Sequence, residues 1–152
     1  NPKTSLENVQ QFNLKMLEKL GIFPDLFVHV EETFPFRTKE LIDGMIIRLL
    51  NDGHDSVVAS KSEFSWIWKE KRKKYFHRLD EGDVPRKFKN KTLIGLQGLG
   101  CITYPEILRK GKLIGKKIGL FETDHPLSSL EVRSEKSLKF SENLLKSFRY
   151  KN

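Results

Sequence analysis

The sequence predicts a three-layer α/β fold in which a mostly parallel sheet is flanked by helices. Amphipathic helical segments alternate with short, continuously apolar strand segments along most of the 152 residues. This alternation is typical of parallel sheets whose two faces are both covered by helices. The length allows one domain with a hydrophobic core, so residues 1–152 are interpreted as a single domain. Residues 62–96 are basic and aromatic, break the alternation, and are interpreted as an insertion.

Capping signals and apolar spacing predict the order helix, strand, helix, strand before the insertion. Thr4 is predicted to cap the first helix in a capping box, and Gly21 is its stop. Thr38 is predicted to cap the second helix, which ends at Gly53. The loop over 31–37 follows the first strand, and α/β sheets place ligands at the carboxyl ends of their strands. The predicted elements are helices over 4–20 and 38–50 and strands over 25–30 and 55–59.

Inside the insertion, two extended segments are predicted on either side of the lysine-rich run Lys71–Lys74. The α/β rhythm then resumes and ends in a helix capped by Ser134. His29 and Cys101 lie in predicted strands and are interpreted as packed core residues rather than reactive groups. The further predicted elements are extended segments over 64–68 and 75–79, strands over 99–104 and 117–122, a helix over 105–108 and a short extended piece over 129–132.

Charge and cysteine content restrict the partners and the compartment. The net charge is +8, and the segment from Lys69 to Lys91 alone contributes +6, from ten basic and four acidic residues. Such a balance favours an anionic partner: a nucleotide, a nucleic acid or an acidic sugar. A single cysteine excludes an internal disulfide and is compatible with a reducing cytoplasm, so a cytoplasmic location is expected. The apolar runs are far shorter than the ~20 residues that cross a bilayer, so no membrane partner is expected.

Two loops carry residue types that suit ligand binding. Arg37 ends the loop after the first strand, where an arginine can donate two parallel hydrogen bonds to a carboxylate or phosphate. The alternative for Arg37 is a solvated side chain near a helix start. Glycines before the strand at 99–104 let a ligand approach the backbone closely, or they serve a turn with positive φ. Their spacing does not match a dinucleotide-binding fingerprint.

Taken in order, these segments resemble the C-terminal portion of the acylneuraminate cytidylyltransferase family, which makes CMP-activated sialic acids and related sugars. The resemblance runs from about Leu26 to Leu145. The matching segments are Glu31–Arg37 for a Gln-Pro-Thr-Ser-Pro-Leu-Arg loop, Gly53–Val58 for a Gly-x-Asp-Ser-Val-Val strand, Leu99–Thr103 for an Asn-Gly-Ala-Ile-Tyr strand, Leu130–Arg133 for Ile-Asp-Ile-Asp and Ser141–Leu145 for an Ala-Glu-x-Leu-Leu helix.

The resemblance implies that this chain is part of a nucleotide-diphospho-sugar-transferase-like fold, with a dimerisation role for residues 62–96. It implies an enzyme that transfers CMP from CTP to a sugar acid and releases pyrophosphate, with CTP, the sugar acid and a second copy of the chain as partners. These 152 residues contain no counterpart of the family's Arg/Gly/Ser/Lys-rich triphosphate loop, so this chain alone is expected to be inactive. The implied substrate-binding residues are Arg37, Thr33, Glu31, Gln97, Gly98 and Gly100.

The resemblance also implies a magnesium ion held by paired aspartates near the C-terminus. Here the first position is Glu131, which is still an oxygen ligand suited to Mg²⁺. The second position is Arg133, which cannot coordinate a cation. In addition, Leu99 replaces an asparagine and Glu31 replaces a glutamine. These departures leave open whether the complete protein is an enzyme.

Two other functions stay open. A non-catalytic member of the family could keep the fold as a sugar-binding, nucleotide-binding or assembly module, and Arg133 favours that interpretation. A basic nucleic-acid-binding domain is the other alternative, because the stretch from Lys69 to Lys91 interleaves cations with aromatic residues. Nucleic acid is not the expected partner, since a run of charges is more often a solvated surface.

Overall fold

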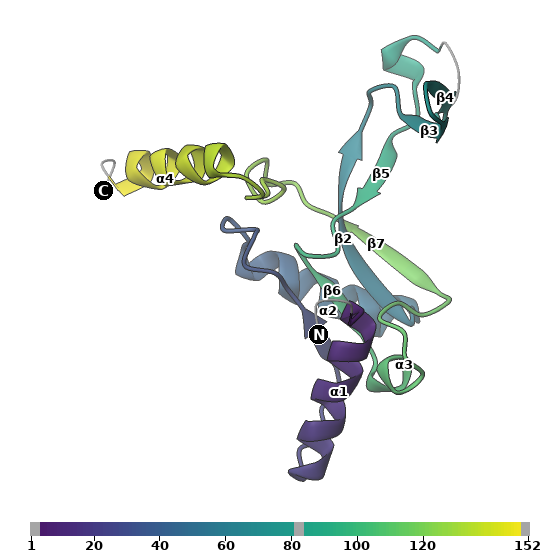
Figure 1. The fold of residues 1–152 in the computed structure, drawn as a ribbon, viewed down its shortest axis with the longest axis vertical. Helices are drawn as coiled ribbons and strands as arrows, with labels where there is room; N and C mark the ends of the chain where they lie inside the picture. The colour runs from purple at the N-terminus through teal and green to yellow at the C-terminus, as the bar shows by residue number, and fades with distance from the viewer. Residues whose placement is uncertain (1–3, 81–83, 150–152) are drawn as a thin grey trace.

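The computed structural model describes residues 4–80 and 84–149. A body of sheet and helices carries two projecting parts, a β-hairpin and the last helix (Figure 1). The elements are α1 (Leu6–Lys19), β1 (Phe27–His29), α2 (Lys39–Asp52), β2 (Ser56–Glu63), β3 (Trp68–Arg72), β4 (Tyr75–Arg78), the 3-10 turn η1 (Arg86–Phe88), β5 (Thr92–Gly95), β6 (Cys101–Thr103), α3 (Pro105–Arg109), β7 (Ile118–Glu122) and α4 (Glu135–Arg149).

The five-stranded sheet is built around β2. Its neighbours are β6, which pairs antiparallel along the first half of β2, and β7, which pairs parallel along the other edge. Strand β1 adds to β6 antiparallel, and β5 pairs antiparallel with the end of β2. Three strands, β1, β2 and β7, therefore run in one direction, and β6 and β5 run against them. The α/β class is confirmed; the opposed direction of β6 is a feature that the sequence did not reveal.

Helices cover both faces of the sheet, which gives the three predicted layers. On one face, Met45 and Leu49 of α2 pack with Val57 of β2. On the other face, Leu14 of α1 packs in a cluster with Val58. Because successive strand residues point to opposite faces, adjacent valines serve two separate cores. The predicted core positions His29 and Cys101 are both buried. Burial raises the pKa of the Cys101 thiol to about 11, so the thiol stays protonated at neutral pH.

Most predicted caps are present, with one correction. Ser5, and not Thr4, caps α1: its hydroxyl accepts a hydrogen bond from the Asn8 amide at 3.3 Å. Thr38 caps α2 as predicted, with its Oγ1 3.3 Å from the Leu41 amide nitrogen. Ser134 caps the last helix, with its Oγ 3.2 Å from the Ser137 amide nitrogen. The extended piece predicted over 129–132 is not a strand, because turns and irregular backbone occupy it.

The insertion projects from the body as an arm, defined here as residues 64–80 and 84–91 (Figure 1). Residues 60–63 of β2 pair with residues 92–95 of β5 and form the neck of the arm. Beyond the neck, β3 and β4 form a two-stranded hairpin. The sequence prediction placed the first extended segment too early: β3 begins at Trp68 and runs through Arg72, so part of the lysine-rich run lies inside a strand.

Helix α4 also projects from the body (Figure 1). Its large apolar side chains, among them Phe140 and Phe148, are about half exposed. Ser141 is buried, and its hydroxyl donates to the Ser137 carbonyl at 2.9 Å. Within the described residues, none of the helices combines the length and apolar character needed to span a membrane.

Candidate functional site

Arg37 joins the loop after β1 to the turn before β6. Its Nε donates to the Leu99 carbonyl at 2.6 Å, and its Nη2 donates to the carbonyls of Glu31 at 2.6 Å and Gly98 at 2.9 Å. Burial lowers the pKa of Arg37, and the nearby Glu31 opposes that shift. Two of the three guanidinium nitrogens are therefore used to hold backbone segments together. Substrate binding by Arg37 stays a prediction, and it would depend on the remaining Nη1.

The two glycines before β6 allow close packing at this junction. A Cβ at Gly98 would lie 2.6 Å from Cδ of Glu31, and a Cβ at Gly100 would lie 3.0 Å from Sδ of Met45. Positive φ angles occur at other glycines of the described chain, so the alternative of a positive-φ turn at these two positions is wrong. The close approach that the sequence predicted for a ligand is made here by protein side chains.

The segment with Glu131 and Arg133 lies against the loop after β1. The Val132 amide donates to the Thr33 carbonyl at 2.8 Å, which connects residues far apart in the sequence. Thr33 Oγ1 donates to Glu31 Oε2 at 3.3 Å. Arg133 Nη2 lies 2.5 Å from Glu131 Oε1, and Glu131, with a smaller contribution from Glu31, raises the pKa of Arg133. The structure thus brings Glu31, Thr33, Glu131 and Arg133 together.

The residues of this site do not fit a magnesium ion held by the protein. Glu131 already pairs with the guanidinium of Arg133, which supplies the positive charge that a metal would bring. Across residues 4–80 and 84–149, no three His, Cys, Asp or Glu side chains are grouped so that they could hold a metal ion. Magnesium binding stays a prediction from the resemblance.

His29 belongs to the site as well as to the core, which the sequence interpretation missed. Its Nδ1 lies 3.3 Å from Gln10 Nε2, and its Nε2 lies 3.5 Å from Glu31 Oε1. Nε2 is buried without a hydrogen bond in the described chain, so Glu31 is its nearest ionic partner. The signal was available, because residues 29 and 31 are two apart and point to the same side of an extended segment.

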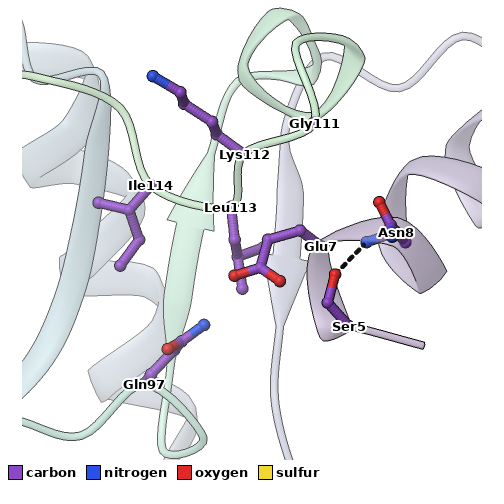
Figure 2. A pocket seen from close by; sticks show the side chains of 8 residues that line it. All are labelled: Ser5, Glu7, Asn8, Gln97, Gly111, Lys112, Leu113 and Ile114. Atoms are coloured by element: carbon purple, nitrogen blue, oxygen red, sulfur yellow. Dashed lines mark hydrogen bonds between the residues drawn. The ribbon is translucent and has the colours of Figure 1, made fainter. Parts of the chain in front are cut away.

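Gln97 faces a different environment from the other predicted residues. Its side chain lines a pocket of about 350 Å³ between the start of α1 and the loop after α3. Figure 2 shows Gln97 at this pocket with Ser5, Asn8 and Lys112 around it. No other predicted site residue lines this pocket. The structure therefore separates the side chain of Gln97 from the cluster of Glu31, Thr33 and Glu131.

Comparison with proteins of known structure identifies the fold of this chain. No family model matches the sequence, and no curated protein is similar to it in sequence. In three dimensions the chain is similar to the crystal structure of a 4-diphosphocytidyl-2C-methyl-D-erythritol synthase from Anaerococcus prevotii, at 12% identity and a TM-score of 0.64. The match covers 95% of this chain and 68% of that chain. This likeness establishes the nucleotide-diphospho-sugar-transferase-like fold.

Proposed function

We propose that the chain is part of a cytidylyltransferase-like enzyme that activates a sugar acid. A hydroxyl oxygen of the sugar acid attacks the α-phosphorus of CTP and forms the new ester bond. The bond from that phosphorus to the bridging oxygen breaks, pyrophosphate leaves, and the hydroxyl proton passes to solvent. Two observations support the proposal: the sequence motifs, and a fold shared with a synthase whose named product carries a diphosphocytidyl group.

One observation carries the proposal: the hydrogen bond between the Val132 amide and the Thr33 carbonyl, at 2.8 Å. It joins the loop after β1, which holds Glu31 and Thr33, to the segment before α4, which holds Glu131. Glu31 and Thr33 would accept and donate hydrogen bonds to sugar hydroxyls. Arg133 would bind the carboxylate of the sugar acid, because a guanidinium matches a carboxylate with two parallel donors.

A turnover assay tests the transfer reaction. CTP, Mg²⁺ and a panel of 2-keto sugar acids are incubated with the chain, and released pyrophosphate is measured. We expect no turnover from the 152 residues alone, because they lack the triphosphate loop, and turnover from a longer chain that supplies such a loop. Full activity of the 152 residues would contradict the claim that they are only part of the enzyme. Absence of CMP transfer by both would contradict the proposed reaction.

A non-catalytic role is the second candidate, and the pairing of Arg133 with Glu131 favours it. A carboxylate that is neutralised by a neighbouring guanidinium is a poor ligand for a metal. In this alternative the chain binds the sugar acid or nucleotide, or assembles with a second copy through the arm, without chemistry. Five exposed aromatic side chains would then lie in the contact between copies: Phe64, Trp66, Trp68, Phe76 and Phe88.

Substitution of Arg133 tests whether its guanidinium keeps a metal ion from Glu131. The Arg133→Asp change removes the cation beside Glu131 and adds a second carboxylate, so we expect Mg²⁺ affinity to rise by roughly tenfold or more. Titration calorimetry with Mg²⁺ measures this directly. Arg133→Ala is the matched control, since it frees Glu131 without adding a ligand, and it should give a smaller gain. Equal affinities for the two variants would show that the second carboxylate position plays no part in metal binding.

A further inference from the structure

The β3–β4 hairpin has two chemically different faces. The strand register pairs Trp68 with Arg78 and, one step along, Lys69 with His77. A bulge between Glu70 and Arg72 then shifts the phase, so that Arg72 lies opposite Tyr75. Because Tyr75 and His77 are two apart on β4, their partners Arg72 and Lys69 share the same face. We call this the basic face, defined by Lys69, Arg72, Tyr75 and His77.

The cations of the basic face are available to a ligand. Lys69, Arg72 and the turn lysines 73 and 74 are all exposed, and among the described residues they take part in no ion pair. The cations on the other side of the arm behave differently. Arg78 Nε lies 3.0 Å from Asp80 Oδ1, and Lys89 Nζ lies 2.9 Å from Asp80 Oδ2. Asp80 therefore pairs with the internal cations Arg78 and Lys89 and not with the cations of the basic face.

The turn of the hairpin is unusual because a lysine in it adopts a positive φ angle. Lys74 has a φ of 71°, and it is the only residue besides glycine with positive φ in the described chain. Two-residue hairpin turns with positive φ strongly favour Asn-Gly or another glycine-containing pair. Here Lys73 and Lys74 form the turn, so two cations stand at the tip in spite of the backbone strain. The Lys74 amide donates to Glu70 Oε1 at 3.1 Å, and this hydrogen bond holds the turn.

We propose that the basic face binds single-stranded nucleic acid. Lys69, Arg72 and the turn lysines would contact phosphates, while Tyr75 and His77 would stack on bases, a combination found in proteins that bind single strands without sequence preference. A second copy of the chain is a poor occupant, because two such faces would place like charges opposite each other. The opposite face of the hairpin carries Trp68, Phe76 and Arg78, and the Arg78 guanidinium stacks on Trp66. This aromatic face stays available for contact between proteins.

Fluorescence anisotropy with labelled oligo(U) and oligo(dT) tests the proposal on the whole chain. We expect binding that weakens steeply between about 50 and 200 mM salt. Combined alanine substitution of Lys69, Arg72 and Lys73 should make the slope of log K against log salt shallower by about 2, since each lost phosphate contact removes ~0.7. Tyr75→Ala should weaken binding about tenfold, whereas Tyr75→Phe should bind like the unchanged chain. Comparison of the two oligonucleotides distinguishes RNA from DNA as the ligand.

The matched control removes the same charge from another part of the molecule. Combined alanine substitution of Lys136, Lys139 and Lys146 on α4 lowers the net charge equally and leaves the hairpin intact. This control should bind nearly as well as the unchanged chain, and circular dichroism should show that all variants are folded. Equal losses in the two triple variants would overturn the proposal, as would the absence of binding at low salt. Binding to anionic phospholipid vesicles but not to oligonucleotides would assign the basic face to a membrane surface instead.

Discussion

Replacing Arg37 with alanine is expected to lower the free energy of unfolding by about 3 kcal/mol. The guanidinium satisfies three backbone carbonyls, two of which belong to the buried residues Gly98 and Leu99. A buried acceptor that loses its donor costs about 1–3 kcal/mol, and the three acceptors share one donor group, so the effects overlap. Urea denaturation followed by far-UV circular dichroism measures the change.

Arg48→Ala is the matched control for this prediction. Arg48 pairs with Asp52 on the surface of α2, where both side chains are more than 40% exposed. Exposed pairs one helical turn apart contribute about 0.3–0.5 kcal/mol, so this change should be nearly neutral. Arg37→Lys should fall between the two, because a lysine cannot reproduce the fork of donors. An Arg37→Ala variant as stable as Arg48→Ala would show that the guanidinium is not a structural clamp, and would return it to the substrate-binding candidates.

Changing Asp80 to asparagine is expected to open the arm while the body stays folded. Asp80 is almost completely buried and receives hydrogen bonds from Arg78, Lys89 and the Ile67 amide. Loss of its charge leaves buried Lys89 without a counter-ion, and disruption of a buried pair shifts such an opening equilibrium by roughly a hundredfold. Trp66 and Trp68 are the only two tryptophans of the chain, so tryptophan fluorescence reports on the arm alone.

Two measurements make the Asp80 prediction specific. In urea, the fluorescence transition of Asp80→Asn should move to lower denaturant than the circular dichroism transition of the body, whereas the two should coincide in the unchanged chain. Asp43→Asn is the control, because Asp43 pairs with Lys39 on the exposed surface of α2. Coincident transitions in Asp80→Asn would show that the arm is not held by this network.

The same network predicts how the arm responds to pH. Hydrogen bonds from Arg78 and then from Lys89 hold the pKa of Asp80 well below its usual range. A depressed folded-state pKa means that the stabilisation is fully present above the ordinary aspartate value of about 3.9. It is lost as the pH falls below that value towards the folded-state pKa. The fluorescence difference between the unchanged chain and Asp80→Asn should therefore be constant near neutral pH and shrink in strong acid.

The sequence predicted the local elements well, because the signals that define them are local. Thr38 and Gly53 at the ends of α2 each act on the backbone within a few residues. The cap of α1 was predicted one residue too early, at Thr4 and not Ser5, because both residue types are good caps and only the final backbone decides. The direction of β6 was also missed, since a fully buried three-residue strand has no pattern that records which neighbours it joins.

The site was predicted in outline and not in detail. The loop with Thr33 and the segment with Glu131, each chosen from its motif, lie side by side although they are about 100 residues apart in the sequence. The use of Arg37 could not be predicted, because hydrogen bonds to backbone carbonyls depend on a turn that folds from a distant segment. The side-chain direction of Gln97 was missed for the same reason: the pocket it faces is completed by α1 and the loop after α3.

The neck of the arm separates the sequence requirements of the arm from those of the body. Residues 60–63 and 92–95 form four antiparallel residue pairs. The chain leaves the sheet after the first of these strands and returns to it in the second. Whatever lies between the two strand ends needs only to keep them at the usual distance of neighbouring strands. The segment can therefore lengthen, shorten or change its charge while the packing around Val57 and Val58 is preserved. Substitutions in the arm can therefore change what it binds without disturbing the core of the body.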